Sequence, residues 1–233
     1  MKILVFTDPH YCSRDGIPGC PDRKPRLSLE KMERLVERAK RDGVGLIVCL
    51  GDFINIESPS SDRKNLETAA EIFGNSGIRC VCCMGNHDGE VFTHDEFARI
   101  TGFEIAPCTV DLPGGKQLVF LDANYDSSYA PYRTGNVDWT DSNLPPEELA
   151  WLDGVLENKD SAVFIHQNVY PEAEIRHRVR NADSLLAILE RHHVTDVFQG
   201  HYHYGADTVY KGIRMTTLRA MCISDDTEIE LEY

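Results

Sequence analysis

The chain has 233 residues, of which 42% are hydrophobic and 27% are charged, so it is long enough to bury a sizeable core. Its formal net charge of −14 repels polyanions, and basic residues are interspersed with acidic ones, so we expect no duplex nucleic-acid partner. No apolar stretch is long enough to cross a bilayer and no cleavage pattern follows the first residues, which predicts no membrane segment and a cytoplasmic location.

The eight cysteines are expected to be reduced thiols, since the chain is longer than a typical disulfide-rich secreted domain and shows no export signal. Cys80, Cys82 and Cys83 lie in a strand-like run whose spacing is not one that zinc sites use, so packing is favoured over zinc binding. Cys12 and Cys20 lie in a loop beside the strand end at Asp8, and the sequence assigns them no role.

Strands and helices alternate in the first half of the chain. The predicted elements are, in order, a strand over 2–7, a loop over 11–26, a helix over 28–43, a strand over 46–50, a helix over 62–74 and a strand over 78–84. Ser28 and Asp62 are the expected N-caps of the two helices, and Gly43 and Gly74 are expected to end them. This βαβαβ order predicts parallel strands, and ligands gather beyond the carboxyl ends of such strands.

The second half of the chain is less regular. The predicted elements begin with a helix near 93–100, strands near 103–106 and 117–121, and a long loop or cap over 123–143. A helix that begins at Pro145 and Pro146 follows, then a strand over 162–165 and a polar loop over 167–180. The last predicted elements are a helix around 184–191, a strand over 196–199 and antiparallel strands over 207–210, 213–218 and 228–231. With no internal repeat or linker, we expect one domain over 1–233, with loop insertions near 11–26, 123–143 and 167–180.

Polar side chains recur where the predicted strands end. The motifs are, in chain order, Asp8-Pro9-His10, Gly51-Asp52, Gly85-Asn86-His87-Asp88, His166 and Gly200-His201-Tyr202-His203. Two side chains two positions apart at a strand end can point the same way, so Asp8 and His10 could bind one ion, and His201 and His203 could serve different ions. A single His at a strand end is usually a hydrogen-bonded or surface residue, but five such motifs in series predict a two-metal site suited to phosphoester hydrolysis.

This series of motifs resembles that of the calcineurin-like metallophosphoesterases, and the resemblance covers almost the whole chain. It implies an α/β fold, a four-layer α/β/β/α sandwich with two mixed β-sheets flanked by helices. It also implies two ligand sets that share Asp52 as a bridge, namely Asp8, His10, Asp52 and His203 for one metal and Asp52, Asn86, His166 and His201 for the other. His87 would not ligate; it would donate a proton to the leaving group or stabilise the phosphoryl oxygens, with Asp88 as the partner that orients it.

The residues after Asp52 bear on the substrate. Asn55 stands where Ser/Thr protein phosphatases have a second Asp, and their Arg-Gly pair is absent, which disfavours a protein substrate. Asn55 instead resembles the class III cyclic-nucleotide and glycerophosphodiester phosphodiesterases. The resemblance thus implies a phosphodiesterase that acts on a small nucleotide-like or glycerol-like phosphodiester, with a metal-bridging hydroxide as nucleophile.

Other activities within the family stay open. Tyr11 and the stretch Arg26-Leu27-Ser28-Leu29 are reminiscent of the manganese-dependent ADP-ribose/CDP-alcohol pyrophosphatases, in which the position of His10 is commonly Gln. The alternatives are therefore a phosphomonoesterase or a nucleotide-diphosphate-conjugate pyrophosphatase. A non-enzymatic scaffold of the same fold is the alternative outside enzymes.

Nitrogen and oxygen ligands suit Mn, Fe, Zn or Co, so two divalent or mixed-valent ions of these metals are expected, with Mn and Fe favoured. The candidate substrate contacts are Asn86, Tyr11, Asn55 and Arg176. Aromatic loop residues could stack on a base or form a packed lid: Tyr125, Tyr129, Tyr132, Trp139 and Tyr170. Loop arginines could hold a second phosphate: Arg14, Arg133, Arg176 or Arg178. His94 and His177 receive no role, and the sequence does not indicate the oligomeric state.

Overall fold

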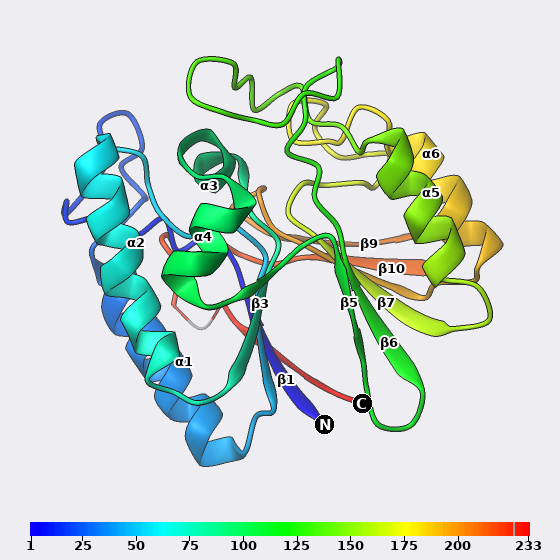
Figure 1. Ribbon diagram of the computed structural model, residues 1–233, viewed down its shortest axis with the longest axis horizontal. Coiled ribbons are helices and arrows are strands. Elements are labelled where there is room, and N and C mark those ends of the chain that lie inside the picture. Colours follow the sequence, from blue (N-terminus) through cyan, green and yellow to red (C-terminus); the bar gives the residue numbers. More distant parts are fainter. Residues whose placement is uncertain (226) are drawn as a thin grey trace.

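Two mixed β-sheets pack face to face in the computed structural model, which describes residues 1–225 and 227–233 (Figure 1). The first sheet contains, in spatial order, β11 (Ile229–Glu232), β1 (Lys2–Phe6), β2 (Leu46–Cys49), β3 (Arg79–Cys82) and β4 (Glu104–Ile105). The second sheet contains β5 (Cys108–Asp111), β6 (Lys116–Phe120), β7 (Asp160–Ile165), β8 (Asp196–Gln199), β10 (Ile213–Thr217) and β9 (Ala206–Tyr210).

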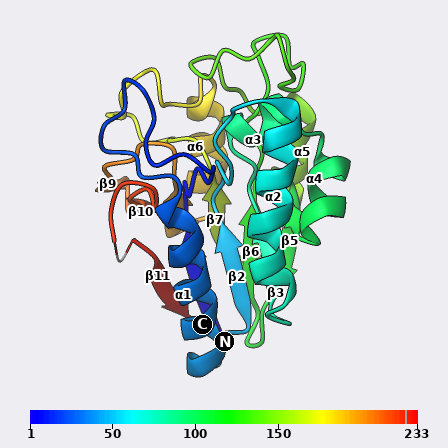
Figure 2. The same ribbon diagram turned by 90° about the vertical axis from the view of Figure 1, so that its left-hand side faces the viewer.

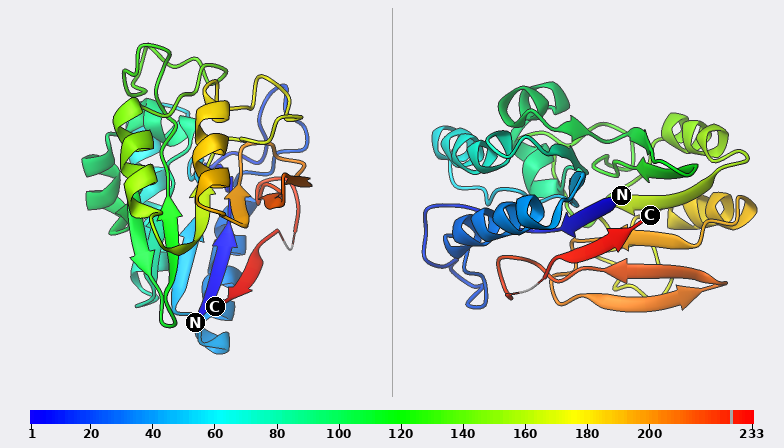
Figure 3. Two further views of the ribbon diagram at one scale, coloured as in Figure 1. Left: turned by 90° about the vertical axis from the view of Figure 1, so that its right-hand side faces the viewer. Right: turned by 90° about the horizontal axis from the view of Figure 1, so that it is seen from below.

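Helices cover the two outer faces. The first sheet is covered by α1 (Leu27–Asp42), α2 (Pro59–Gly74), α3 (Asn86–Val91) and α4 (His94–Thr101) (Figure 2). The second sheet is covered by α5 (Pro146–Val155) and α6 (Ala182–Arg191) (Figure 3). The layers are therefore helix, sheet, sheet and helix, which confirms the predicted four-layer sandwich. No helix in the described part of the chain combines the length and the apolar character that crossing a membrane requires.

Alternation of side chains along β1 shows how the layers are held together. Phe6 belongs to the apolar cluster under α1 and α2, whereas Val5 belongs to the cluster between the two sheets. Aromatic rings of the second sheet stack within this inter-sheet layer, with centroids 4.9 Å apart for Phe120 and Phe164 and 5.0 Å apart for Phe164 and Phe198. This buried layer fixes the two sheets, and hence their strand ends, relative to each other.

Strand direction gathers the sequence motifs at one end of the sandwich. The strands β1, β2, β3 and β4 are parallel to one another, as are β6, β7, β8 and β10. The carboxyl ends of these strands therefore open toward the loops over 11–26, 123–143 and 167–180, at the top of Figure 1, while both termini lie at the other end. The predicted βαβαβ arrangement is confirmed.

Two of the predicted helix caps are wrong. Helix α1 begins one residue earlier, and Ser28 lies inside it; its hydroxyl donates to the carbonyl of Pro9 at 2.5 Å, which ties the helix to the loop after β1. Helix α2 begins at Pro59, and the cap is Ser58, whose hydroxyl accepts from the backbone of Ser61. Asp62 instead accepts from the backbone N–H of Glu57 at 2.7 Å, so its carboxylate closes the turn that precedes the helix. Several capping residues stand near the start of α2, so the pattern alone does not say which one caps it, whereas no side chain caps α1.

Short elements account for the other differences. The six-residue helix α3 starts within the Asn86-His87-Asp88 motif, where the sequence indicated only a strand end. Strand β5 was not predicted because it is short and partly exposed, and β4 is only two residues long. Strand β11 pairs antiparallel with β1, so it completes the first sheet from the far end of the chain.

All eight cysteines are free, which agrees with the predicted reduced thiols. Cys80, Cys82 and Cys83 are buried, and Cys82 lies in the apolar cluster under the helices whereas Cys83 lies between the sheets. Cys12 is buried, whereas Cys20 is half-buried. The strand cysteines thus act as small core residues.

Candidate metal centre

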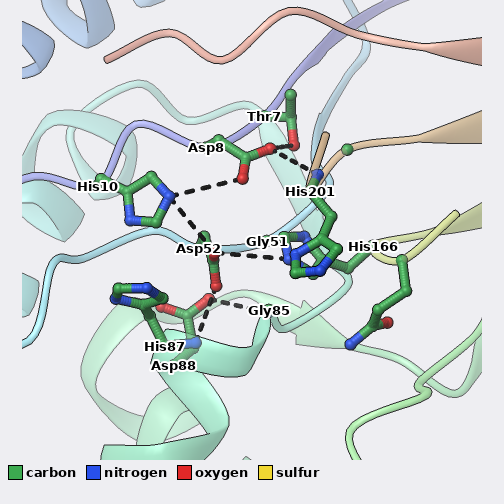
Figure 4. Close-up of polar contacts among 12 residues, drawn as sticks. Thr7, Asp8, His10, Gly51, Asp52, Gly85, His87, Asp88, His166 and His201 are labelled. Atoms are coloured by element: carbon green, nitrogen blue, oxygen red, sulfur yellow. Dashed lines mark hydrogen bonds and ion pairs between the residues drawn. The ribbon is translucent and has the colours of Figure 1, made fainter. Parts of the chain in front are cut away.

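Each predicted metal ligand follows the carboxyl end of a strand. Asp8 and His10 follow β1, Asp52 follows β2, Asn86 follows β3, His166 follows β7, and His201 and His203 follow β8. Figure 4 shows the side chains of Asp8, His10, Asp52, His166 and His201 turned toward a common space. Four of these residues adopt positive φ, with values of 50° at Asp8, 42° at His10, 51° at Asp52 and 65° at His201. Non-glycine residues rarely adopt this conformation, and such strain is characteristic of functional sites.

Two glycines allow the strand ends to approach one another. A Cβ at Gly85 would lie 2.2 Å from Asp52 Oδ1. A Cβ at Gly200 would lie 2.1 Å from Thr7 Oγ1 and 2.7 Å from Asp8 Oδ2. Any larger residue at either position would therefore displace a carboxylate of the site.

The first group of ligand atoms joins β1, β2 and β8. The ring Nε2 of His10 lies 3.6 Å from Asp8 Oδ1, 3.4 Å from Asp52 Oδ2 and 3.1 Å from His203 Nε2. His203 Nε2 also lies 3.3 Å from Asp8 Oδ1. One ligand atom from each of these four residues lies within 4.8 Å of the others, an arrangement that could hold a metal ion.

A second group shares Asp52 with the first. Asp52 Oδ2 lies 3.5 Å from His166 Nε2, and the ligand atoms of Asp52, His166 and His201 lie within 4.8 Å of one another. The amide Oδ1 of Asn86 is buried at the edge of the same space without a hydrogen-bond partner. The same carboxylate oxygen therefore faces both groups, as a bridging ligand must.

Hydrogen bonds orient the ligands. Asp8 Oδ2 accepts from the hydroxyl of Thr7 and from the backbone N–H of His201, so only Oδ1 remains for an ion. The ring Nδ1 of His166 lies 2.6 Å from the carbonyl of Leu50 and donates to it, which leaves the lone pair of Nε2 facing Asp52. Thr7 was not identified from the sequence, since a threonine at a strand end carries no signal of this role.

The residues fit a pair of metal ions. Four buried polar atoms that face the space have no hydrogen-bond partner among residues 1–225 and 227–233, namely Asp8 Oδ1, Asn86 Oδ1, His166 Nε2 and His201 Nε2. Native proteins rarely leave buried polar atoms unpaired, so an ion is the expected partner. The family uses a dinuclear metal centre, and clustered Asp and His ligands are present here.

The protonation states of the ligands also suit a cation. Burial raises the pKa of Asp8, but the close approach of the His10 and His203 rings to its carboxylate outweighs burial and holds the pKa well below its ordinary value. Burial lowers the pKa of His10 to about 3. At His166, burial lowers the pKa, but the charges of Asp52 and Asp8 raise it to about 9. The carboxylates thus remain ionised, as the ligands of a cation must be.

A cavity of about 480 Å³ opens onto this centre. Asp52, Asn86 and His201 lie at its base. Its walls come from the three loops near 11–26, 123–143 and 167–180 and from the turn after β8: Arg23, Trp139, Glu174, His177, Tyr202 and Tyr204. Sequence reasoning suggested a substrate role only for Trp139 among these, because the others lie in aperiodic loops or beside a stronger motif.

The wall of the cavity contacts the metal ligands directly. The ring of Trp139 lies 5.3 Å from that of His177 and 5.6 Å from that of His201, measured between centroids. The ring of His177 lies 5.1 Å from that of His201. Arg23 contributes a guanidinium that forms no ion pair with any residue that the structure describes. The cavity therefore offers flat apolar surface, one cation and the metal ligands to a single small molecule.

Residues 1–205 match the sequence profile of the calcineurin-like phosphoesterase family. The chain belongs to this family. It is a metal-dependent phosphohydrolase, because the chain both belongs to this family and holds clustered Asp and His side chains that can bind the metal ions. The recognition made from the motifs is confirmed.

Named relatives of this calcineurin-like phosphoesterase include one curated enzyme. A cAMP/cGMP dual specificity phosphodiesterase of Mycobacterium tuberculosis is 24% identical over 238 residues, which cover 97% of this chain and 69% of that protein. A solved dimetal phosphatase from Danio rerio has a TM-score of 0.80 at 17% identity and covers 96% of this chain and 88% of its own. GAP50, the anchor in the inner membrane complex of Plasmodium, has a TM-score of 0.64 at 14% identity, and the match covers 97% of this chain and 74% of GAP50. At these identities the solved structures show the fold alone.

His87 and Asp88 occupy different positions in this phosphoesterase. The ring of His87 lines the cavity with its centroid 4.5 Å from that of His10, and its buried Nδ1 has no hydrogen-bond partner. The carboxylate of Asp88 accepts from the backbone N–H groups of Phe53 and Gly85, and no hydrogen bond joins it to the His87 ring among the described residues. Burial and the charge of Asp52 raise the pKa of Asp88 to about 7. Asp88 thus fixes the backbone around His87 and does not bond to the His87 ring.

The remaining candidate contacts lie outside the cavity lining. Tyr11 is buried in the apolar cluster under the helices, and its backbone N–H donates to Phe53. The side-chain amide of Asn55 donates to the carbonyl of Ile56 at 3.2 Å. Arg176 stacks on the outer side of the wall, with its guanidinium carbon 5.1 Å from the centroid of the Trp139 ring. Direct contact of these side chains with substrate stays a prediction.

Proposed function

We propose that this chain is a phosphodiesterase that hydrolyses a small nucleotide-like phosphodiester, with glycerol-like diesters as weaker substrates. The observation that carries the proposal is the cavity of about 480 Å³ that opens onto both groups of ligand atoms. Its volume lies in the range of small-molecule sites, about 300–1,000 Å³.

The walls of the cavity suit a nucleoside. Trp139, Tyr202 and Tyr204 offer aromatic faces on which a base can stack. The carboxylate of Glu174, which lies at the same wall, can accept hydrogen bonds from ribose hydroxyl groups. The likeness to a cAMP/cGMP phosphodiesterase over nearly the whole chain supports this choice of substrate class.

The proposed roles of the residues follow from their positions. Two ions held by the ligands named above, for which we expect Mn or Fe, supply Lewis acidity and an activated water. Asn86, at the start of α3, and Arg23, in the loop near 11–26, both line the cavity and bind the phosphoryl oxygens, so that the reacting phosphorus stays in one orientation. His87 holds a proton at its ring and delivers it to the departing alkoxide oxygen. The aromatic wall excludes water from the far side of the diester.

Arg23 also favours one alternative, a pyrophosphatase acting on nucleotide-diphosphate conjugates. Its guanidinium lines the same cavity, forms no ion pair with any other described residue, and could hold a second phosphate. A non-enzymatic scaffold is disfavoured, since every ligand position and His87 are retained. A cytoplasmic location stays a prediction from the sequence.

A substrate panel tests the proposal. The values of kcat/KM are compared for cAMP, cGMP, a glycerophosphodiester, ADP-ribose, p-nitrophenyl phosphate and bis-p-nitrophenyl phosphate, with protein loaded with Mn²⁺. We expect a cyclic nucleotide to exceed every monoester and diphosphate conjugate by about tenfold or more, the discrimination that one well-placed polar contact provides. The His201→Ala variant, prepared in parallel, controls for contaminating phosphatase. Preference for ADP-ribose would select the pyrophosphatase, and preference for the monoester would reject both diester activities.

A further inference from the structure

A cysteine that follows the last sequence motif lies beside the metal centre. The ligand atoms of His10, His203 and Cys222 lie within 4.8 Å of one another. Cys222 and His10 are fully buried, and His10 Nδ1 has no hydrogen-bond partner. This group overlaps the first group of ligand atoms through two imidazoles, and it adds the sulfur atom that the family resemblance did not include.

The backbone fixes the position of this thiol. The N–H of Cys222 donates to the carbonyl of Asp8 at 3.2 Å, and its carbonyl accepts from Lys24 at 2.7 Å. The neighbouring residue Met221 donates to the carbonyl of Thr7 at 3.0 Å. The chain after β10 is thus tied to the same strand end that presents Asp8, so the thiol stays beside the ligands rather than moving with a free loop.

Cys222 differs from the strand cysteines of this chain. Cys82 and Cys83 lie within apolar clusters, where a thiol acts as a small hydrophobe. The Sγ atom of Cys222 lies within 4.8 Å of a ring nitrogen of His10 and of His203, and it forms no hydrogen bond to any residue in the described part of the chain. This thiol is therefore placed among candidate ligand atoms and not only among apolar side chains.

We propose that Cys222 supplies a sulfur ligand to the metal ion that His10 and His203 hold. On binding, the S–H bond breaks, its proton passes to solvent, and a sulfur lone pair forms the bond to the metal, with no change of oxidation state. Thiolate favours Zn, Co and Fe over Mn, so this sulfur biases the first metal position toward the softer ions. The inference rests on the metal centre and not on the substrate, so a failed substrate panel would leave it standing.

The absorption spectrum of the cobalt-loaded protein tests the sulfur ligand. Thiolate bound to Co²⁺ gives a charge-transfer band in the near ultraviolet, which nitrogen and oxygen ligands do not give. We expect the band in the wild-type protein and in Cys12→Ser, and not in Cys222→Ser. Cys12 is the matched control because it is equally buried and lies in the loop beside the same site. A wild-type protein without the band, or a Cys222→Ser protein that keeps it, would overturn the proposal.

Metal affinities provide a second readout that does not depend on activity. In Cys222→Ser, we expect affinity for Zn²⁺ at one of the two sites to fall by about tenfold or more, while affinity for Mn²⁺ changes little. Calorimetry in buffers of different ionisation enthalpy should show one proton fewer released per Zn²⁺ bound. Equal losses for both metals, or unchanged proton release, would mean that Cys222 only packs beside the ligands.

Discussion

The backbone N–H of His87 donates to Asp52 Oδ1 at 2.9 Å. That bond occupies one carboxylate oxygen and leaves Oδ2, which lies 3.4 Å from His10 Nε2 and 3.5 Å from His166 Nε2, to face both groups of ligands. The residue proposed as proton donor and the carboxylate proposed as bridge are therefore held in a fixed relation through the main chain. A change in the side chain of His87 preserves this bond.

His87→Ala should keep both metal ions but lower kcat by about 10²–10⁴-fold, the range of general acid–base catalysis. The main-chain bond to Asp52 remains, so the metal centre should be intact. Metal analysis together with steady-state kinetics on a diester measures both quantities. His192→Ala is the control, since His192 pairs with Asp153 outside the cavity and its loss should leave kcat unchanged. A His87→Ala protein that lacks metal would identify His87 as a ligand.

Gly85→Ala should empty the metal centre. A Cβ at this position would lie 2.2 Å from Asp52 Oδ1 and 2.3 Å from the Asp52 backbone nitrogen, so the carboxylate must move. Gly154→Ala is the matched control because a Cβ there would meet no described atom within 4 Å beyond its chain neighbours and the backbone of its own helix. In helix α5 it should stabilise the fold by about 0.4–1 kcal/mol. Metal content and thermal unfolding are measured for both. Full metal content in Gly85→Ala would show that the strand ends are less tightly packed than described.

Arg23→Ala should reduce kcat/KM on a diester by about 10- to 100-fold, since a hydrogen bond to a charged group contributes about 1.5–3 kcal/mol. Metal content should not change, because Arg23 lines the cavity without contacting a ligand through a hydrogen bond. Arg41→Ala, on the exposed end of α1, should retain full activity. Unaltered kinetics in Arg23→Ala would remove this residue from the phosphoryl-binding role.

The pair of His94 and Asp122 should make stability depend on pH. His94 Nε2 lies 2.8 Å from Asp122 Oδ2, and this hydrogen bond raises the pKa of His94 although burial opposes it. Because the pKa of His94 is higher in the folded state, the pair makes its full contribution to the free energy of unfolding below the unfolded-state pKa of about 6.5. That contribution is lost as the pH rises through the folded-state pKa.

We therefore expect His94→Gln to lower the free energy of unfolding more at about pH 5.5 than at about pH 8.5. Denaturant unfolding of both proteins at the two pH values gives the comparison. The magnitude should be modest because part of the His94 side chain is exposed. The same loss at both pH values would show that the pair does not titrate differently in the folded state.

The sequence predicted the parallel strands of the first sheet and the ligand positions because both depend on strong local patterns. Apolar runs that end in Asp8 and Asp52 mark parallel strands of one sheet, and such strands must end at one edge. His166 follows a strand of the second sheet, so its convergence with them depends on how the two sheets pack, which the family resemblance implied. The positive φ values at Asp8 and Asp52 do not follow from these patterns, since they depend on contacts between strands.

The cavity walls and the cysteine beside them could not be predicted. Arg23, Glu174 and His177 lie in aperiodic loops, and their convergence depends on how those loops fold over the strand ends. Cys222 lies in a turn after the last motif, and its distance in sequence from His10 hides its proximity in space. The cap at Asp62 was misassigned because several capping residues stand near the start of α2, and the cap at Ser28 because α1 begins before it without a side-chain cap.

The central claim is that the carboxylate of Asp52 binds two metal ions. Measurement of the metal content of the wild-type protein and of the Asp52→Asn variant tests this claim most directly. Asp62→Asn, which changes a buried carboxylate outside the cavity, is the control. We expect two ions per chain in the wild-type protein and in the control, and weakened binding of both ions in Asp52→Asn. One ion retained at full occupancy in Asp52→Asn, or a single ion in the wild-type protein, would contradict the account.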